Sequence, residues 1–296
     1  MTKLTKNVML MGNGHFNYYI IGSENAALVE CGTTAGAYFF TREWFLLQEK
    51  PKIKYIVLLH SHFDHVCGIV ALKELFPDAV VVASKETQQL LTKEKIVRTL
   101  FKSDQHVMQA YLSSGLIREE YSFPVPDKII VDMTVGEGDR LEIDNGLNVR
   151  FLEAVGHSPC SIAAYLEEDQ VMLTSDAAGG FLGDQEVAPV FYQDYKLYIN
   201  TIKKFMAFPT NIVGPGHGKV PQGREAIGFY WQALESAEKC YNWIKADLTN
   251  GKDEDQLTSE LFAKYITDFL TYYPEDLMNN VMRLLIKRVK VQENIS

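Results

Sequence analysis

The chain has 296 residues and a formal net charge of −9, from 29 lysines and arginines against 38 aspartates and glutamates. A hydrophobic fraction of 47% with 11% aromatic residues predicts a packed globular core and argues against intrinsic disorder. The acidic balance argues against a protein that binds nucleic acid, because contacts with phosphates call for a basic surface.

The sequence shows no sign of export or membrane insertion. The apolar run VMLM near the N-terminus is too short for the core of a signal peptide, and no stretch approaches the length of a membrane span. Four scattered cysteines form no C-x-x-C pair, which is typical of a reduced protein without a disulfide framework. We therefore expect a cytoplasmic protein with no membrane partner.

Short apolar runs dominate up to about residue 220, and each is bounded by Gly, Pro, Asn, Asp or charged residues, as strands are. The predicted strands are 16–21, 26–30, 53–59, 79–84, 128–132, 147–155, 161–167, 170–175 and 211–216. Apolar residues at helical spacing predict helices at 66–76 and 194–208, and one or two helices between 84 and 118. This alternation of strands and helices predicts an α/β body.

From Arg224 onward the pattern is helical. Apolar residues at helical spacing, such as Phe229 and Trp231, predict that these helices bury a face on the body. We therefore predict an α/β domain over residues 1–222 and a C-terminal all-helical extension, packed on the body, over residues 223–296.

The segment HSHFDH, residues 60–65, follows the strand predicted at 53–59 and precedes a helix. Imidazole nitrogen and carboxylate oxygen both ligate zinc and iron, and loops of this kind commonly carry the functional groups of α/β folds. Three more ligand-type residues lie on tight turns at strand ends: His157 in GHSPCS, Asp176 in TSD and His217 in PGHG. Glycine beside a ligand allows close approach of the backbone, and proline stiffens the turn.

Chance is a poor explanation for this set, and we interpret it as a metal site. We expect the two remaining histidines, His15 and His106, to be ordinary surface or core residues. The candidate metal ligands are His60, His62, Asp64, His65, His157, Asp176 and His217.

In order and spacing, H-x-H-x-D-H followed by GHS, SD and GHG resembles the metallo-β-lactamase superfamily, and NYYIIG and ALVECG resemble the first strands of that family. The resemblance covers about residues 7–220. It implies an αββα sandwich that holds two divalent transition-metal ions, zinc or iron, with manganese a further candidate. The implied ligands are His60, His62 and His157 for one ion and Asp64, His65 and His217 for the other, with Asp176 bridging.

Three positions depart from the family pattern without removing a ligand. Glu30 stands where aspartate is usual, Cys160 stands where glycine is usual after proline, and Ser175 stands where glycine usually precedes the bridging aspartate. We interpret Cys160, like Cys67 beside His65, as a small buried residue rather than a metal ligand.

Two metal ions that share a water can lower its pKa toward neutrality and polarise a carbonyl or phosphoryl oxygen, which indicates a hydrolase. We expect a metal-bridging hydroxide to be the nucleophile, with Asp64 and Asp176 as the catalytic carboxylates. The motifs contain no dedicated acid for an amine leaving group, whereas a thiolate leaves without one. This favours a thioesterase, and esters and lactones are intermediate cases.

Other branches of the family fit less well. Antibiotic-resistance enzymes of the periplasm are disfavoured by the missing signal peptide, and nucleic-acid-processing enzymes by the charge. Flavodiiron proteins usually have glutamate where this chain has His62, and they carry a flavodoxin domain for which there is no room. A mono-iron sulfur dioxygenase remains open, as does a metal-binding signalling effector with little turnover. A homodimer also remains open.

The C-terminal helices resemble the extensions of glyoxalase II-type thioesterases and, more closely, those of the quinolone-signal thioesterases that cleave an aminobenzoylacetyl-CoA thioester. By that comparison, residues 188–198 and the start of the segment 274–285 line the mouth of the site. Phe191, Tyr192 and Met278 are then candidates to contact the acyl or aryl group of a small thioester or ester substrate. Ordinary core packing is the alternative for each of the three.

Overall fold

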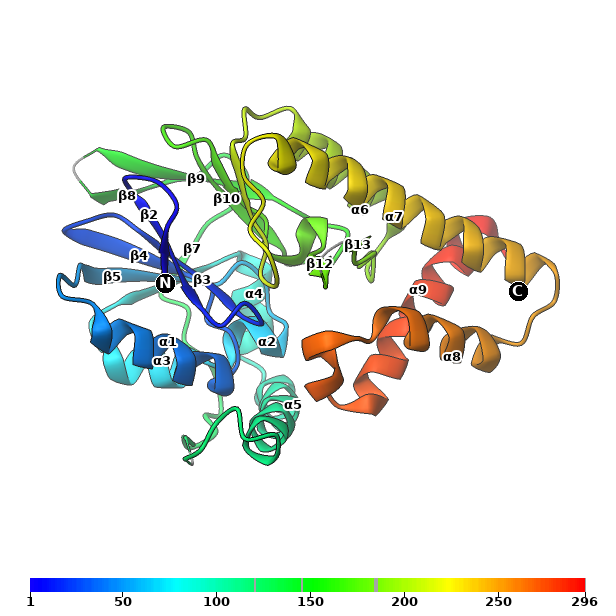
Figure 1. Cartoon of the computed structure of the whole chain (residues 1–296), viewed down its shortest axis with the longest axis horizontal. Helices are drawn as coiled ribbons and strands as arrows, with labels where there is room; N and C mark the ends of the chain where they lie inside the picture. Colours follow the sequence, from blue (N-terminus) through cyan, green and yellow to red (C-terminus); the bar gives the residue numbers. More distant parts are fainter. Residues whose placement is uncertain (120, 145, 184–185, 296) are drawn as a thin grey trace.

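A computed structural model of the chain describes residues 1–119, 121–144, 146–183 and 186–295. Two β-sheets lie face to face between layers of helices, and a further group of helices extends to one side (Figure 1). This is the αββα sandwich with C-terminal helices that the sequence predicted. Each helical layer buries one apolar face and each sheet buries both of its faces, which is the reason that the layers stack.

The N-terminal half of the chain forms a seven-stranded sheet in the order β1-β2-β3-β4-β5-β6-β7. Pairing is antiparallel from β1 to β4 and parallel from β4 to β7. Its strands are β1 (Thr2–Lys3), β2 (Val8–Gly12), β3 (Asn17–Ile21), β4 (Asn25–Val29), β5 (Lys52–Val57), β6 (Val80–Ala83) and β7 (Met133–Thr134).

Period-two alternation explains how this sheet packs. In β3, Tyr18 and Ile20 join the core under the helices, whereas Tyr19 and Ile21 join the core between the two sheets. Both faces of the strand are thus covered, which explains a strand without polar alternation. The outer helices are α1 (Thr34–Leu46), α2 (Phe63–Val66), α3 (Ile69–Leu75), α4 (Lys85–Leu91) and α5 (Glu94–Ser113).

The second sheet has five strands in the order β14-β11-β10-β9-β8, with β11 and β14 parallel and the other neighbours antiparallel. Helices α6 (Tyr195–Met206) and α7 (Arg224–Thr249) share a core with its outer face. The strands are β8 (Arg140–Asp144), β9 (Leu147–Glu153), β10 (Ile162–Leu166), β11 (Val171–Leu173) and β14 (Ile212–Gly214); β12 (Phe181–Leu182) and β13 (Glu186–Val187) form a separate hairpin, and η1 (Ser175–Ala178) follows β11.

Several elements differ from the sequence prediction. The strands β2 and β8 and the shorter β1, β7, β12 and β13 were not predicted. Two further differences concern a predicted strand and a helix. Residues 128–132 are not a strand, because the N–H of Ile129 donates to the carbonyl of Leu91 at the end of α4 and so draws the segment away from a regular ladder. Helix α1 was not predicted, since its sequence TAGAYFFTREWFL is apolar around most of its surface and lacks a clear helical stripe.

The C-terminal extension consists of α7, α8 (Glu254–Tyr265), η2 (Asp268–Tyr272) and α9 (Glu275–Glu293). Helix α7 runs outward from the sandwich, and the segments that follow turn back toward it (Figure 1). Phe229 of α7 and Leu285 of α9 belong to the core that covers β9 to β11. Trp231, which was predicted to be buried, is instead 61% exposed, because it lies on the opposite side of α7.

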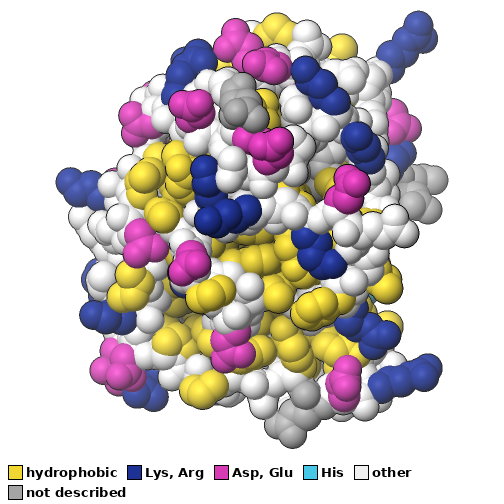
Figure 2. Space-filling model, turned by 90° about the vertical axis from the view of Figure 1, so that its left-hand side faces the viewer, with side chains coloured by type: hydrophobic (Ala, Val, Ile, Leu, Met, Phe, Trp, Pro, Cys, Tyr) yellow, Lys and Arg dark blue, Asp and Glu magenta, His cyan; other side chains and the backbone are white. Residues whose placement is uncertain are grey.

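Lysines and arginines alternate with aspartates and glutamates on the end of the sandwich remote from the extension, around a central hollow with hydrophobic atoms (Figure 2). Within the part of the chain that the structure describes, no helix has both the length and the apolar character needed to cross a bilayer.

Candidate metal centre

The segments that follow β5, β9, β11 and β14 carry the seven predicted ligands at the end of the sandwich that faces the extension, with Asp64 and His65 in α2 and Asp176 in η1. These side chains form two groups that share Asp176, and the ligand atoms within each group lie within 4.8 Å of one another. The first group is His60, His62, His157 and Asp176, and the second group is Asp64, His65, His217 and Asp176.

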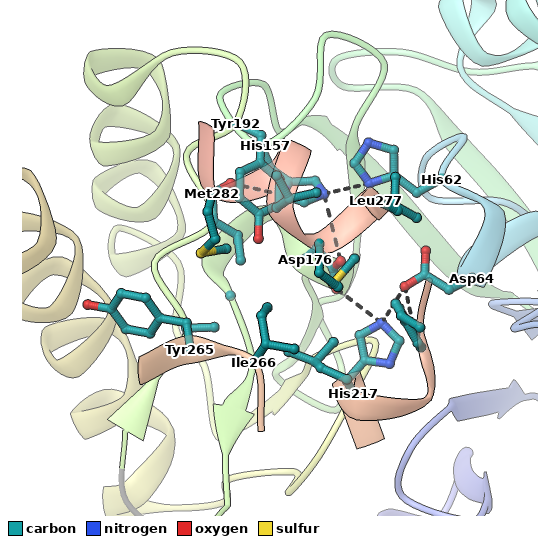
Figure 3. Close-up of a pocket in the computed structure, with 18 of the residues that line it drawn as sticks. His62, Asp64, His157, Asp176, Tyr192, His217, Tyr265, Ile266, Leu277 and Met282 are labelled. Atoms are coloured by element: carbon teal, nitrogen blue, oxygen red, sulfur yellow. Dashed lines mark hydrogen bonds and ion pairs between the residues drawn. The ribbon is translucent and has the colours of Figure 1, made fainter. Parts of the chain in front are cut away.

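The spacing within each group suits a common ion. The Nδ1 atom of His62 lies 3.1 Å from Nε2 of His157, and the Nε2 atoms of His65 and His217 are also 3.1 Å apart. A tetrahedral ion bound at zinc–nitrogen distances holds its nitrogen ligands roughly 3.3 Å apart. His62 and His157 of the first group and Asp64 and His217 of the second group lie around the shared carboxylate of Asp176 (Figure 3).

Three of the histidines are oriented by a hydrogen bond from the ring nitrogen that faces away from the centre. Such bonds fix the tautomer and leave Nε2 free to bind a metal. The Nδ1 atom of His65 donates to Oε2 of Glu30 at 2.7 Å. The Nδ1 atom of His157 donates to the carbonyl of Val190 at 2.9 Å, and that of His217 donates to the carbonyl of His15 at 2.5 Å.

Two of the departures from the family pattern thus have structural roles. Glu30 orients His65, and Ser175 places its hydroxyl 3.2 Å from Nδ1 of His60. Ser175 has a φ of 48°, in the left-handed region that favours glycine, which explains why glycine is usual at this position.

His60 provides an independent test of whether a metal fits. Its Nε2 atom is buried, has no hydrogen-bond partner among the described residues, and faces Oδ2 of Asp176 at 3.9 Å. An orphaned buried nitrogen is costly unless something else satisfies it. A metal ion held by the first group would do so.

Glycine is required at two of the turns. A Cβ atom on Gly216 would lie 2.5 Å from Cε1 of His65, and one on Gly156 would lie 2.2 Å from the backbone nitrogen of Tyr198. Gly156 also has a φ of +121°. These contacts are the close backbone approach that the glycines beside His157 and His217 predicted.

The two groups differ in charge. Burial lowers the pKa of all three histidines of the first group, and that of His157 falls to about 3. These imidazoles are therefore neutral at physiological pH and have lone pairs available for a metal.

The second group behaves in the opposite way. Burial lowers the pKa of His65, but Glu30 and Asp176 outweigh it and raise that pKa well above its usual value. The pKa of His217 is also raised, because Asp176 and Asp64 oppose the effect of burial. Burial raises the pKa of both aspartates, yet the neighbouring imidazoles hold it below the usual range. The carboxylates of this group therefore favour the protonated form of its imidazoles, in contrast to the first group.

The donor set of five imidazoles and two carboxylates fits divalent transition metals such as zinc or iron. Neither group includes a thiol. The Sγ atom of Cys160 lies 3.2 Å from the hydroxyl of Ser61, and burial raises the pKa of the Cys67 thiol well above its usual value. Both cysteines are buried, as the sequence interpretation expected.

A cavity of about 300 Å³ adjoins the two groups. Its described lining is mainly apolar and contains no lysine or arginine. The extension supplies much of the wall, through Tyr265, Ile266, Phe269, Leu270, Tyr273, Leu277, Met278, Val281, Met282, Leu284 and Leu285.

The three predicted substrate contacts fare differently. Tyr192 and Met278 line the cavity, and the Tyr192 ring lies 5.3 Å from that of His157. Phe191 does not line it: its side chain is fully buried and packs on Tyr195, with 5.2 Å between the ring centroids. Adjacent loop residues point in different directions, so the prediction for Phe191 is corrected to a core residue.

The sequence did not single out two residues of the extension that reach the ligands. The hydroxyl of Tyr273 donates to Oδ2 of Asp64 at 2.9 Å, and the ring of Phe269 stacks on His217 with 5.0 Å between centroids. His15, expected to be an ordinary residue, accepts from His217 through its carbonyl, whereas His106 is exposed on α5. Tyr273 lies in the segment YYP, residues 272–274, which by sequence alone indicates only the start of a helix at Pro274.

The family model of the metallo-β-lactamase superfamily matches residues 11–217, a range that contains all seven ligand candidates, and the chain belongs to this superfamily. Its members are mostly metal-dependent hydrolases.

Among individual relatives, the chain is similar to the metallo-β-lactamase fold-containing protein ST1585 of Sulfurisphaera tokodaii, with 25% identity over 207 residues, 68% of this chain and 71% of that protein. It is 26% identical to a linear primary-alkylsulfatase of a Pseudomonas species over 70% of this chain and 43% of the relative. It is 25% identical to a hydroxyacylglutathione hydrolase of Haemophilus ducreyi over 58% of this chain and 54% of that protein. The chain thus spans about half the length of the latter two proteins.

Solved structures extend the likeness of the fold. ST1585 superposes with a TM-score of 0.58 at 19% identity, over 78% of this chain and 86% of that one. The stereoselective inverting sec-alkylsulfatase Pisa1 from Pseudomonas superposes with a TM-score of 0.62 at 17% identity, over 97% of this chain and 49% of that one. With 97% covered, this second likeness includes the C-terminal helices as well as the sandwich.

Proposed function

We propose that the protein is a dinuclear metal-dependent hydrolase that cleaves a thioester with an apolar acyl or aryl group, such as an acyl-CoA. The observation that carries this proposal is the joint arrangement of two His/Asp groups and a mainly apolar cavity of about 300 Å³ beside them. The ions would be zinc or iron, with manganese a further candidate.

Two divalent ions, when bound, lower the pKa of a shared water and polarise the scissile carbonyl. The residues of the chain set the geometry for this chemistry. Asp176 faces both groups and would hold the ions at a fixed spacing, and Asp64 lies 3.3 Å from Nε2 of His217 on the cavity side. The apolar wall would exclude bulk water and orient the acyl group toward the centre.

The leaving-group argument favours a thioester. Three phenols line the cavity, those of Tyr192, Tyr265 and Tyr273, and burial raises the pKa of each above its usual value. Such phenols are weak acids and would give little help to an amine or alkoxide leaving group. A thiolate, whose parent thiol has a pKa of about 8.5, needs no such help.

The rim of the cavity supports a substrate with an anionic carrier. Helix α5 presents a surface hollow that shares Thr99 with the cavity and is otherwise lined by Glu94, Lys95, Arg98 and Lys102. Arg98 is paired with Glu94 at 2.7 Å, whereas the exposed lysines on either side could meet phosphate groups. The hydroxyacylglutathione hydrolase among the relatives is, by its name, a hydrolase of an acylated thiol.

A second candidate is hydrolysis of an alkyl sulfate ester. The observation that favours it is the likeness to the sec-alkylsulfatase over 97% of this chain. The described lining of the cavity contains no lysine or arginine to bind a sulfate group, which makes this the weaker proposal.

The test is a substrate panel with metal-loaded full-length protein. Acyl-CoA thioesters of increasing chain length, an acylglutathione, a lactone and a primary and a secondary alkyl sulfate are each assayed for kcat/KM. We expect the highest value for an acyl-CoA, with loss of turnover after chelation and recovery on adding metal. Turnover restricted to sulfates would favour the second candidate. If no substrate is turned over faster by the metal-loaded protein than by the chelated protein, the result would favour a signalling effector.

A further inference from the structure

The extension contributes more than an apolar wall, because a short stretch before α9 reaches the second group. The hydroxyl of Tyr273 donates to Oδ2 of Asp64 at 2.9 Å, and the same oxygen lies 3.3 Å from Nε2 of His217. A carboxylate oxygen has lone pairs enough to accept this bond and also bind a metal. Tyr273 belongs to the C-terminal extension, whereas Asp64 belongs to the sandwich, so this hydrogen bond joins the two parts of the protein.

Phe269, four residues before Tyr273, contacts a second ligand of the same group, His217. Its ring stacks on His217 with an interplanar angle of 27°, and on His15 at 5.5 Å between centroids. The carbonyl of His15 is the acceptor that orients His217. The stretch 268–273 therefore touches Asp64, His217 and the residue that orients His217.

The first group has polar partners of a different origin. His60 is held by the hydroxyl of Ser175, and His157 by the carbonyl of Val190, both from the sandwich. The hydrogen bond from the extension thus goes to a ligand of the second group, which makes the two metal positions unequal.

The backbone conformation and the ring packing of Tyr273 orient its hydroxyl toward Asp64. Pro274 follows directly, and Tyr273 has the extended conformation, φ −83° and ψ 156°, that a residue before proline favours. Its buried ring packs edge-to-face on Phe63 of the H-x-H-x-D-H turn, with 5.1 Å between centroids. The phenol is therefore held between the turn and the extension.

We propose that Tyr273 is a positioning residue for the metal position formed by Asp64, His65 and His217, and that metal binding there is linked to docking of residues 268–273 on the sandwich. The linkage is reciprocal: an ion at this position stabilises the docking of residues 268–273, and loss of that docking lowers the affinity for the ion. Because Phe269, Leu270 and Tyr273 also line the cavity, the second ion then controls closure of the cavity wall. This inference rests on the dinuclear centre proposed above, but not on the thioester substrate.

The first test is Tyr273→Phe, which removes the hydroxyl and keeps the ring. Full-length protein is stripped with chelator and titrated with zinc in competition with a chromophoric chelator. We expect one of the two zinc affinities to fall by about 10- to 100-fold, the usual cost of losing a partner of a ligand, with the other unchanged. Tyr265→Phe is the matched control, since Tyr265 also lines the cavity but its buried hydroxyl has no hydrogen-bond partner among the described residues. Unchanged affinities in Tyr273→Phe, or equal weakening of both, would overturn the proposal.

The second test measures the docking of residues 268–273 on the sandwich directly, by amide hydrogen exchange. In the wild type, filling the second position should slow amide exchange in residues 268–273, and Tyr273→Phe should lose most of that protection. Exchange that is the same with and without zinc overturns the linkage, and so does a wild type that takes up only one ion. Two bound ions without thioester turnover would instead count against the proposed function and leave this inference standing.

Discussion

The Nε2 atom of His65 lies 3.3 Å from the Oδ2 atom of Asp176, and the same oxygen lies 3.7 Å from Nε2 of His157 in the other group. One carboxylate therefore faces both groups and would compensate the charge of an ion in each. Glu30, 2.7 Å from Nδ1 of His65, adds a second negative charge to one side only. This arrangement leads to distinct expectations for the charge of Asp176 and for the pH dependence of each group.

Asp176→Asn should lower the metal content from about two ions per chain to about one, and should reduce kcat/KM by at least about a hundredfold. Asparagine is nearly isosteric but neutral, so two cations would be left with too little negative charge between them. Elemental analysis and steady-state kinetics on the same preparation check both effects. Asp78→Asn, at an exposed site, is the control. Full metal content with near-normal activity would show that the bridging assignment is wrong.

Metal binding at the second group should depend on pH more strongly than binding at the first. The pKa of His65 and that of His217 are raised, so an ion must displace protons there, and its affinity should rise as pH increases. The pKa of His157 is about 3, so the first group is already deprotonated. Zinc titrations between about pH 6 and about pH 8 should show one affinity that rises by up to about tenfold per unit for each proton displaced and one that stays flat. Two affinities with the same pH slope would contradict this charge assignment.

Tyr192→Phe should leave most of the thioester activity, within about threefold, because the residue is proposed only to shape the cavity next to His157. The measurement is kcat/KM for a thioester and for its oxygen-ester analogue. A collapse restricted to the oxygen ester would identify the Tyr192 hydroxyl as an acid for the leaving group. The preference for thioesters would then lose its main physical support.

Val281→Phe should shift the acyl preference toward shorter chains. Val281 is partly buried and lines the cavity from α9, so a larger ring there removes space. We expect kcat/KM for the longest accepted acyl chain to fall by about tenfold or more, with little change for an acetyl thioester; one or two methylenes of lost contact account for that factor. Val291→Phe is the matched control on the same helix, since Val291 is 66% exposed. An equal loss for short and long chains would mean that the substitution disturbs the fold or the centre rather than the space for the chain.

Asp104 should make the protein less stable above about pH 6. It is buried and accepts hydrogen bonds from the backbone N–H and hydroxyl of Thr34, and burial outweighs these bonds and raises the pKa of its carboxyl to about 6. A carboxyl whose pKa is higher in the folded state contributes stability that is full below its unfolded pKa and is lost as pH rises through the folded value. Relative to the wild type, Asp104→Asn should therefore gain about 1–3 kcal/mol between about pH 4 and about pH 7.5, measured by denaturant unfolding. A difference between the two proteins that does not change with pH would contradict the raised pKa.

Much of the centre is readable from the sequence. The ligands are chemically distinctive and lie on turns where short apolar runs end, and glycines mark the positions at which a side chain would collide, such as Gly216 against His65. Period-two and helical spacing likewise indicate most strands and helices, because these patterns are set by neighbours in the chain. The segment 128–132 and helix α1 are exceptions, since tertiary contacts decided the first and the second lacks a stripe.

The surroundings of the centre were decided only by the tertiary structure. No spacing distinguishes Tyr192, which faces the cavity, from Phe191, which faces the core, because a loop has no period that fixes side-chain direction. The bond from Tyr273 to Asp64 joins positions 209 residues apart, and it depends on how α7 to α9 fold back on the sandwich. Local chemistry in the sequence determined which residues can hold metal ions; the packing of distant segments decided which ligands the extension supports and what shape of substrate the cavity admits.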